Sequence, residues 1–223
     1  MTAPTAWIVV LPLKALGRAK SRLHDLPIHV RRALVVAMAR DVCDAVLACP
    51  GVEEVVVVSG DPRWEGLLGS PRVQHVADAH TDTLNDALRR GAGACDTKRS
   101  RYGVAALTGD LPALRPDELA QALTHASRTS TAFVPDARGD GTTMFAARSL
   151  SEFWPQFGEC SATLHSQAGA QMICLPELTG LRQDVDTLDD LKRVQDLGLG
   201  LHTATVLLTL VNSSSEAALA RWP

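Results

Sequence analysis

The sequence is poor in aromatic residues and lacks the cysteine patterns that bind metals or build disulfide frameworks. Aromatic residues make up 4% of the 223 residues, with a single tyrosine. The five cysteines are odd in number and include no C-x-x-C pair, which argues against a zinc site and against a disulfide framework. This usage predicts a reducing, cytoplasmic setting.

The chain also lacks a strong net charge and long apolar segments. Its formal charge is −3 and its isoelectric point is near 6.1, whereas a nucleic-acid-binding domain is usually strongly basic. The longest apolar stretch near the C-terminus, residues 203–211, is about half the length of a membrane helix. No basic segment precedes the short apolar run near the N-terminus, as it would in a signal peptide. We therefore expect no nucleic acid and no membrane among the partners.

Two common phosphate-binding motifs are missing as well. The sequence contains no G-x-x-x-x-G-K-[ST], and no G-x-G-x-x-G follows the first apolar run. That run is followed instead by "LPLKALGRAKSRL", residues 11–23, in which Lys14, Arg18, Lys20 and Arg22 fall within nine residues. Each cation–anion pair at 4 Å gains about 4 kcal/mol at an effective dielectric near 20, so a polyphosphate would meet several such charges together. A solvated basic turn is the alternative interpretation.

What is present is an alternation of apolar strand patterns and helical patterns. Strands are predicted at 6–13, 53–61, 72–78, 102–110, 130–136 and 181–186, and helices at 27–49, 83–94, 114–126 and 187–198. Irregular, glycine-rich segments are expected at 137–145 and 157–170. This order predicts a single Rossmann-like α/β domain, with a mostly parallel central sheet and helices on both faces. We expect its core at about 7–200 and a C-terminal tail at about 201–223.

Aspartates follow two of the predicted strands, where ligands bind in such sheets. Asp110 ends the fourth strand, and Asp184 and Asp186 alternate along the short strand near the C-terminus, so they point the same way. Two carboxylates on one side repel each other unless a cation lies between them, and Mg²⁺ suits carboxylates together with phosphates. Asp186 could instead only cap the next helix, and Asp189 and Asp190 are assigned to that helix start.

Two glycine-rich patches lie between these acids. In "GDGTT" and "FGECS" the backbone can approach a ligand closely, and Thr142 and Ser161 could help to hold a phosphate. Ser161 and His165 are four residues apart, so a nucleophilic serine–histidine pair is conceivable, although no nucleophile elbow is present. A cationic loop, three aspartates and two such patches together favour metal-assisted transfer of a nucleotidyl group.

The motifs also carry a resemblance. "LPLKALGRAKSRL", "TLNDAL", "GDLPAL", "PDARGDGTT", "FGECSATLH" and "GLRQDVDTLDDL" occur in this order in the guanylyltransferases of coenzyme F420 biosynthesis. The sequence most resembles the actinobacterial branch, which uses phosphoenolpyruvate, and the resemblance runs from about residue 7 to residue 200. It implies a nucleotidyltransferase domain of the glycosyltransferase-A type that joins GTP to a phosphorylated three-carbon acid and releases pyrophosphate.

The resemblance also implies roles for individual residues. The metal ligands, for Mg²⁺, would be Asp110, Asp184 and Asp186. The phosphate of phosphoenolpyruvate would be held by Thr142, Gly158 and Ser161. The nucleotide would be held by Lys14, Lys20, Ser21, Arg22 and Asn85. Asp110, Lys14 and Lys20 would act in catalysis, and an unstable product could be handed to the next enzyme of the pathway.

Several alternatives remain open on the sequence alone. The acid could be 2-phospho-L-lactate or 3-phospho-D-glycerate instead of phosphoenolpyruvate. A molybdenum-cofactor or sugar-nucleotide enzyme would usually carry L-x-A-G-x-S-x-R-M after the first strand, where this chain has "LKALGRAKSRL". A non-catalytic nucleotide-binding module is the alternative outside the enzymes.

Overall fold

The structure is a computed structural model that describes residues 6–17, 23, 25–78, 83–94 and 102–217, and the side chains of these up to residue 211. The strands are β1 (Ala6–Pro12), β2 (Val52–Ser59), β3 (Val73–Ala77), β4 (Tyr102–Leu107), β5 (Thr131–Pro135), β6 (Thr142–Ala147) and β7 (Gln171–Met172). The helices are α1 (Ile28–Ala48), α2 (Arg63–Leu67), α3 (Leu84–Gly93), α4 (Pro116–Ala126), the 3-10 helix η3 (Leu150–Glu152), α5 (Ser161–Gln167), α6 (Thr179–Arg182), α7 (Leu188–Leu197) and α8 (Leu201–Ala217).

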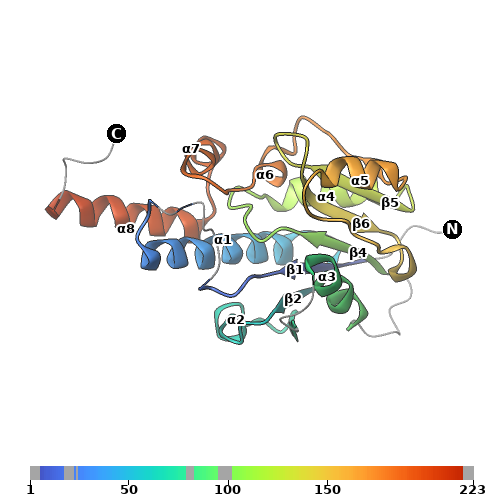
Figure 1. Ribbon diagram of the computed structural model, residues 1–223, viewed down its shortest axis with the longest axis horizontal. Coiled ribbons are helices and arrows are strands. Elements are labelled where there is room, and N and C mark those ends of the chain that lie inside the picture. The colour runs from blue at the N-terminus through green and yellow to red at the C-terminus, as the bar shows by residue number, and fades with distance from the viewer. Residues whose placement is uncertain (1–5, 18–22, 24, 79–82, 95–101, 218–223) are drawn as a thin grey trace.

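One sheet of seven strands organises the molecule, in the order β3-β2-β1-β4-β6-β5-β7 (Figure 1). Every strand except β6 runs in the same direction, because β6 is antiparallel to both of its neighbours and all other pairs are parallel. The predicted α/β fold with a mostly parallel sheet is thus confirmed. The chain moves outward from β1 through β2 to β3 and then returns to place β4 on the other side of β1. Ligands in open α/β sheets bind at such a reversal, beyond the carboxyl ends of the strands.

Strand β1 is buried on both faces, as its continuous apolar sequence predicted. Val9 and Leu11 pack in the cluster that contains residues of α1 and α4, and Ile8 and Val10 pack in the cluster that contains residues of α3 and α5. Successive side chains of a strand point to opposite faces, so this division follows from the pleat. Helices therefore cover both faces of the sheet and leave its carboxyl edge to the loops.

The described part of the C-terminal segment expected at about 201–223 is helix α8. Residues 201–217 are helical, and α8 runs alongside α1 at one end of the molecule (Figure 1). The buried carboxylate of Asp41 on α1 accepts hydrogen bonds from the N–H groups of His202 and Thr203, at 2.9 and 2.8 Å. It satisfies two of the otherwise unpaired N–H groups at the start of α8.

Three further expectations from the sequence were wrong. Residues 142–147, expected to be irregular, form β6, and residues 161–167, also expected to be irregular, form α5. Residues 181–186 are not a strand, because α6 ends at Arg182 and 183–186 form a connection outside the sheet. The capping box of Thr187 and Asp190 at the start of α7 is present as predicted, and Gly198 has a positive φ of 89° at its end.

Among the described residues, no single helix has both the length and the apolar content needed to cross a membrane. Helix α7 and residues 201–211 of α8 are long and apolar enough only when they are taken together. The two helices meet at a bend of 118°.

Candidate functional site

The loop after β1 is anchored to the region around α2. The N–H of Leu16 donates to the buried carboxylate of Asp61 at 3.0 Å, and the indole N–H of Trp64 donates to the carbonyl of Lys14 at 3.2 Å. Asp61 also binds the guanidinium of Arg63, and this hydrogen bond holds the pKa of the carboxyl well below its usual range. Asp61 is therefore ionised at neutral pH and fixes the loop backbone while the Lys14 side chain extends into solvent.

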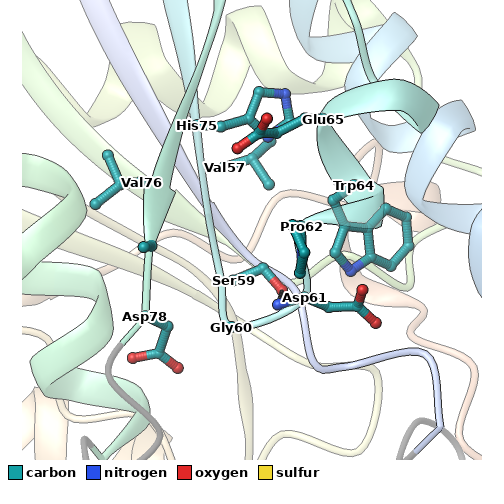
Figure 2. Close-up of a pocket in the computed structure, with 11 residues that line it drawn as sticks. Val57, Ser59, Gly60, Asp61, Pro62, Trp64, Glu65, His75, Val76 and Asp78 are labelled. Carbon is teal, nitrogen blue, oxygen red and sulfur yellow. Dashed lines mark hydrogen bonds between the residues drawn. The ribbon is translucent and has the colours of Figure 1, made fainter.

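A cavity of about 270 Å³ lies beside this loop, at the carboxyl ends of β2 and β3. Figure 2 shows Ser59, Gly60 and Asp61 on one side of it and Val76 and Asp78 on the other. Its lining includes three carboxylates, those of Asp61, Glu65 and Asp78. Asp61 is paired with Arg63 and Asp78 with Arg90, so two of these carboxylates are already partnered by arginines and the lining does not by itself select one part of a nucleotide.

The ends of β1 and β4 meet at the reversal in strand order. Gly109 lies against the Leu13 side chain so closely that a Cβ atom at Gly109 would overlap it. The loop that carries Lys14 and the segment that carries Asp110 are therefore direct neighbours. The half-buried Asp110 thus lies at the edge where the sequence predicted it.

The Asp184–Asp186 segment is joined to Asp110 through the backbone. The N–H of Val185 donates to the carbonyl of Asp110 at 3.1 Å, and Val185 is fully buried. Asp184 and Asp186, on either side of it, are half-buried. The predicted alternation of the two acids around an apolar residue thus exists, although the strand that was expected to produce it does not.

Two buried carboxylates hold this segment in place. Glu118, on α4, accepts the N–H groups of Gly180 and Leu181 at 3.2 and 2.7 Å. Asp190, on α7, accepts the N–H of Asp186 at 3.2 Å in addition to its capping contacts with Thr187. Asp190 was predicted only to stabilise a helix start, and the structure shows that it also fixes the backbone of Asp186.

The chemistry of these acids fits a hard divalent cation. Carboxylate oxygens are the protein ligands that Mg²⁺ prefers, and it usually takes one or two of them together with phosphate oxygens and water. Among the described side chains, no three of the histidine, cysteine, aspartate and glutamate type are already gathered as a metal cage. Asp110, Asp184 and Asp186 do not form such a group, so the structure brings their backbone segments together without assembling a metal site from these side chains alone.

Thr142 reaches the same edge of the sheet because β6 runs in the reverse direction. The N–H of Thr108, just after β4, donates to the carbonyl of Thr143 at 3.0 Å. The turn before β6 is fixed by Asp136, whose carboxylate accepts the N–H of Gly139 at 2.6 Å. A Cβ atom at Gly141 would touch the same carboxylate, so glycine suits this position.

The second glycine patch is attached to α3 through Asn85. The amide of Asn85 donates to the carbonyl of Phe157 at 3.0 Å and accepts the N–H of Phe157 at 2.8 Å. Gly158 follows with a φ of +140°, a conformation that L side chains rarely adopt. Asn85, which was predicted to bind the nucleotide, thus also positions Gly158, which was predicted to bind the phosphate of the acid.

His165 is buried beneath this patch and bonded to Thr142. Its Nδ1 lies 3.0 Å from the Thr142 hydroxyl, and the N–H of Gln156 donates to its Nε2 at 2.9 Å. Burial lowers the pKa of His165 to about 4, so the ring is neutral at pH 7. Because both ring nitrogens are engaged and the imidazole is fully buried, His165 is not an exposed base for Ser161.

The structure gathers most of the predicted residues at one edge of the sheet. Asp110, Asp184 and Asp186 lie on adjoining segments next to the loop of Lys14, and Thr142, Gly158 and Ser161 surround the neighbouring end of β6. The predictions for Lys20, Ser21 and Arg22 fall outside the described residues. The supporting roles of Asp61, Glu118 and His165 were not predicted, because their partners lie far away along the chain.

Comparison with known sequences shows which family the chain resembles. The family described as "Guanylyl transferase CofC like" matches residues 7–211. A protein of Thermomonospora curvata named phosphoenolpyruvate guanylyltransferase is 40% identical over 219 residues, covering 98% of this chain and 96% of its own length. A protein of Streptomyces coelicolor with the same name is 43% identical over 206 residues, covering 92% and 97%.

Solved structures with low sequence identity share the fold. A protein of Desulfovibrio desulfuricans described as a putative nucleotide-diphospho-sugar transferase superposes with a TM-score of 0.70 at 16% identity over 94% of this chain and 95% of its own. Rv0371c of Mycobacterium tuberculosis, solved in complex with manganese, superposes with a TM-score of 0.53 at 20% identity, covering 87% of this chain and 100% of its own. With the match to the family over residues 7–211 and relatives that are 40% identical or more, the chain belongs to the CofC-like guanylyl transferase family.

Proposed function

We propose that this chain is a phosphoenolpyruvate guanylyltransferase of coenzyme F420 biosynthesis. The observation that carries the proposal is the backbone hydrogen bond between Val185 and Asp110, because it makes the segment of Asp184 and Asp186 the neighbour of Asp110, beside the loop of Lys14. The names of the relatives support phosphoenolpyruvate as the acid. A phosphate oxygen of phosphoenolpyruvate attacks the α-phosphorus of GTP, and the bond from that phosphorus to the bridging oxygen of the β-phosphate breaks. The products are enolpyruvyl-2-diphospho-5′-guanosine and pyrophosphate.

In this proposal GTP lies across the ends of β1, β2 and β3. Lys14, together with Lys20, Ser21 and Arg22 of the same loop, binds the triphosphate, and the two lysines offset the charge that builds up on the leaving pyrophosphate. The acidic cavity beside Asp61 receives the nucleoside end. Asn85, at the start of α3, lies between the nucleotide and the acid.

Asp110, Asp184 and Asp186 would hold a divalent metal, which we assign as Mg²⁺. When bound, the metal would bring the two anionic substrates together and reduce their repulsion. Thr142, Gly158 and Ser161 orient the phosphate of the acid for attack. No covalent enzyme intermediate is needed, since the phosphate is itself the nucleophile. Orientation of this kind can contribute about 7–11 kcal/mol to catalysis.

The direct test is pyrophosphate release from GTP and Mg²⁺, with each candidate acid supplied separately. Release with phosphoenolpyruvate, and not with 2-phospho-L-lactate or 3-phospho-D-glycerate, is the expected result. Release with another acid would keep the reaction and replace the substrate. No release with any acid, from protein that binds GTP, would favour the non-catalytic binding module. An enzyme that consumes the unstable product should be included as a trap, and faster release in its presence would support direct hand-over.

Replacing Lys14 with alanine should raise the KM for GTP roughly fivefold, since one solvent-exposed ion pair contributes about 1 kcal/mol. Lys20→Ala should act in the same direction. Lys192→Ala is the matched control, because Lys192 is an exposed lysine on α7 that pairs with Asp189. Equal KM values for GTP in the Lys14 and Lys192 variants would return this loop to the solvated-turn interpretation.

Thr142→Val and Thr143→Val form a second matched pair. Both hydroxyls are buried on β6 and bond to different groups, Thr142 to His165 and Thr143 to the backbone of β5. Losing a hydrogen bond to a charged phosphate should raise the KM for phosphoenolpyruvate about tenfold or more in Thr142→Val. Thr143, whose hydroxyl lies 3.4 Å from the carbonyl of Val134, should give little change when replaced. A similar KM in both variants would exclude Thr142 from the phosphate site.

A further inference from the structure

The environment of His165 fixes its protonation state. The ring is stacked on Phe145, with centroids 4.7 Å apart and planes inclined by 21°. Phe133 and Phe157 contact it at centroid distances of 5.5 and 5.7 Å. The His165 side chain is 0% exposed, and this burial disfavours the imidazolium. The side chain is therefore a neutral imidazole, with one donor nitrogen and one acceptor nitrogen.

The hydrogen-bond partners then decide which nitrogen carries the proton. A backbone N–H can only donate, so Nε2, which receives the N–H of Gln156, must be the acceptor. The proton of the neutral ring is consequently on Nδ1. Nδ1 lies 3.0 Å from the Thr142 hydroxyl oxygen and its N–H donates to that oxygen, while the backbone of Ser161 also accepts a hydrogen bond from the ring. The tautomer of His165 is thus set by a loop residue nine positions before it.

This arrangement determines what the Thr142 hydroxyl can offer to a ligand. A hydroxyl has one proton and two acceptor lone pairs. Because one lone pair is used by Nδ1–H, the Thr142 proton points away from His165. Phosphate oxygens only accept hydrogen bonds, so a hydroxyl that presents its proton attracts them, and one that presents a lone pair repels them. The opposite tautomer would draw the Thr142 proton toward the ring and leave a lone pair facing the phosphate.

His165 also joins the parts of the phosphate site to one another. Its Nε2 holds Gln156, and the next residue, Phe157, is held by Asn85 on α3. Gly158 comes directly after Phe157, and Ser161 lies one turn before His165 on α5. One buried ring therefore connects all three residues to which the phosphate was assigned.

We propose that His165 is a positioning residue that orients the Thr142 hydroxyl as a donor to the phosphate of the three-carbon acid. The proposal rests on the function proposed above, and specifically on the placement of that phosphate at Thr142. His165 itself does not touch the substrate.

Two substitutions separate the two nitrogens of the ring. In His165→Asn, the side-chain amide nitrogen can take the place of Nδ1 and still donate to Thr142. In His165→Gln, the amide oxygen can take the place of Nε2 and still accept from Gln156, but the donor to Thr142 is lost. We expect His165→Gln to raise the KM for phosphoenolpyruvate about tenfold, with the KM for GTP changed less than about twofold. His165→Asn should raise the KM for the acid by about threefold or less.

The experiment measures both KM values and kcat for the two variants, in the unchanged background and in the Thr142→Val background. If His165 acts through the Thr142 hydroxyl, His165→Gln should cause no further rise in the KM for the acid once that hydroxyl is absent. The KM for GTP reports whether each variant is folded. Phe145→Leu, which removes the stacked ring and leaves both hydrogen bonds, should lower the unfolding temperature without the selective change in KM.

Each other outcome overturns a defined part of the proposal. Equal effects of glutamine and asparagine, or a tenfold effect of His165→Gln that persists with Thr142→Val, would reduce His165 to a structural residue. A rise in the KM for the acid with Thr142→Val but not with His165→Gln would overturn the positioning role and leave the proposed function intact. No effect of Thr142→Val on that KM would remove the phosphate site, and the role of His165 with it.

Discussion

Asp184→Asn is expected to lower kcat/KM with phosphoenolpyruvate on the order of 10³-fold while the protein remains folded. Asparagine keeps the shape of the half-buried side chain but removes the charge that would attract a divalent cation. The anchor of this segment is the backbone N–H of Val185, which the substitution leaves unchanged. The loss should therefore fall on turnover and on the Mg²⁺ concentration needed for half-maximal rate.

Asp189→Asn is the control for this prediction. Asp189 lies five residues further along, at the start of α7, and its side chain is 76% exposed. Its replacement also removes one negative charge, so it corrects for any general effect of net charge on Mg²⁺ or GTP. Steady-state rates should be measured over a range of Mg²⁺ concentrations, with thermal unfolding in parallel. Turnover by Asp184→Asn at the rate of the Asp189 variant would remove Asp184 from the metal site.

Gly180→Ala is expected to be the most destabilising of the small substitutions. Gly180 lies on α6 against the backbone of Ala113, and a methyl group there would overlap the carbonyl oxygen of Ala113. Backbone atoms cannot turn aside as side chains do, so α6 must move away from α4. The movement would also break the hydrogen bonds from Gly180 and Leu181 to the buried Glu118. We expect a loss of about 3 kcal/mol in the free energy of unfolding, which corresponds to a fall in Tm of roughly 6–12 °C.

The same substitution should impair catalysis below the new Tm, because α6 leads directly into the Asp184–Asp186 segment. Gly93→Ala is the control, since Gly93 lies on α3 with open space around its Cα. Alanine is the better helix former, so this variant should be as stable as the unchanged protein or more stable by about 0.5 kcal/mol. Calorimetry and initial rates on both proteins would check the prediction. A Tm for Gly180→Ala equal to that of Gly93→Ala would show that α6 can shift freely.

The parts of the fold that could be predicted are the helices and strands whose buried faces show in the local pattern of apolar residues. Strand β1 reads as a continuous apolar run because both of its faces are covered by helices. Helix α1 shows apolar residues at helical spacing because it packs against the sheet on one side and against α7 and α8 on another. Strand β6 was missed although all six of its residues are buried. It forms a hairpin with β5, directly before it, and also pairs with β4, about 40 residues earlier. The glycine-rich turn between β5 and β6 hid the start of β6 in the local sequence.

Helix α5 was missed for a different reason. It has only seven residues and begins after Cys160, whose positive φ of 54° is unusual for a residue other than glycine. The strand predicted over 181–186 failed because alternation around Val185 has another cause. Val185 is buried against α1 and α7, outside the sheet. An alternating pattern records which side chains are buried and does not identify the element that buries them.

The candidate site likewise has residues that could be predicted from the sequence and contacts that could not. The rule that ligands bind at the carboxyl ends of strands was enough to select Asp110 and the loop of Lys14 from the sequence. The contacts that orient these groups, such as Glu118 with Leu181, join residues about 60 positions apart and have no local signature. Sequence motifs therefore indicated which groups act, and only the fold shows how they are held.

The reversed direction of β6 has a consequence for how this enzyme could change its substrate. In the proposed assignment, the groups that bind GTP precede Asp110 in the chain, and those that bind the acid begin at Thr142. In this assignment the two substrates are recognised by successive parts of the chain, which are joined by the β4–β6 pair and by the hydrogen bonds between Asn85 and Phe157. Substitutions in the second part of the chain could therefore change which phosphorylated acid is bound, while the residues that bind GTP stay the same.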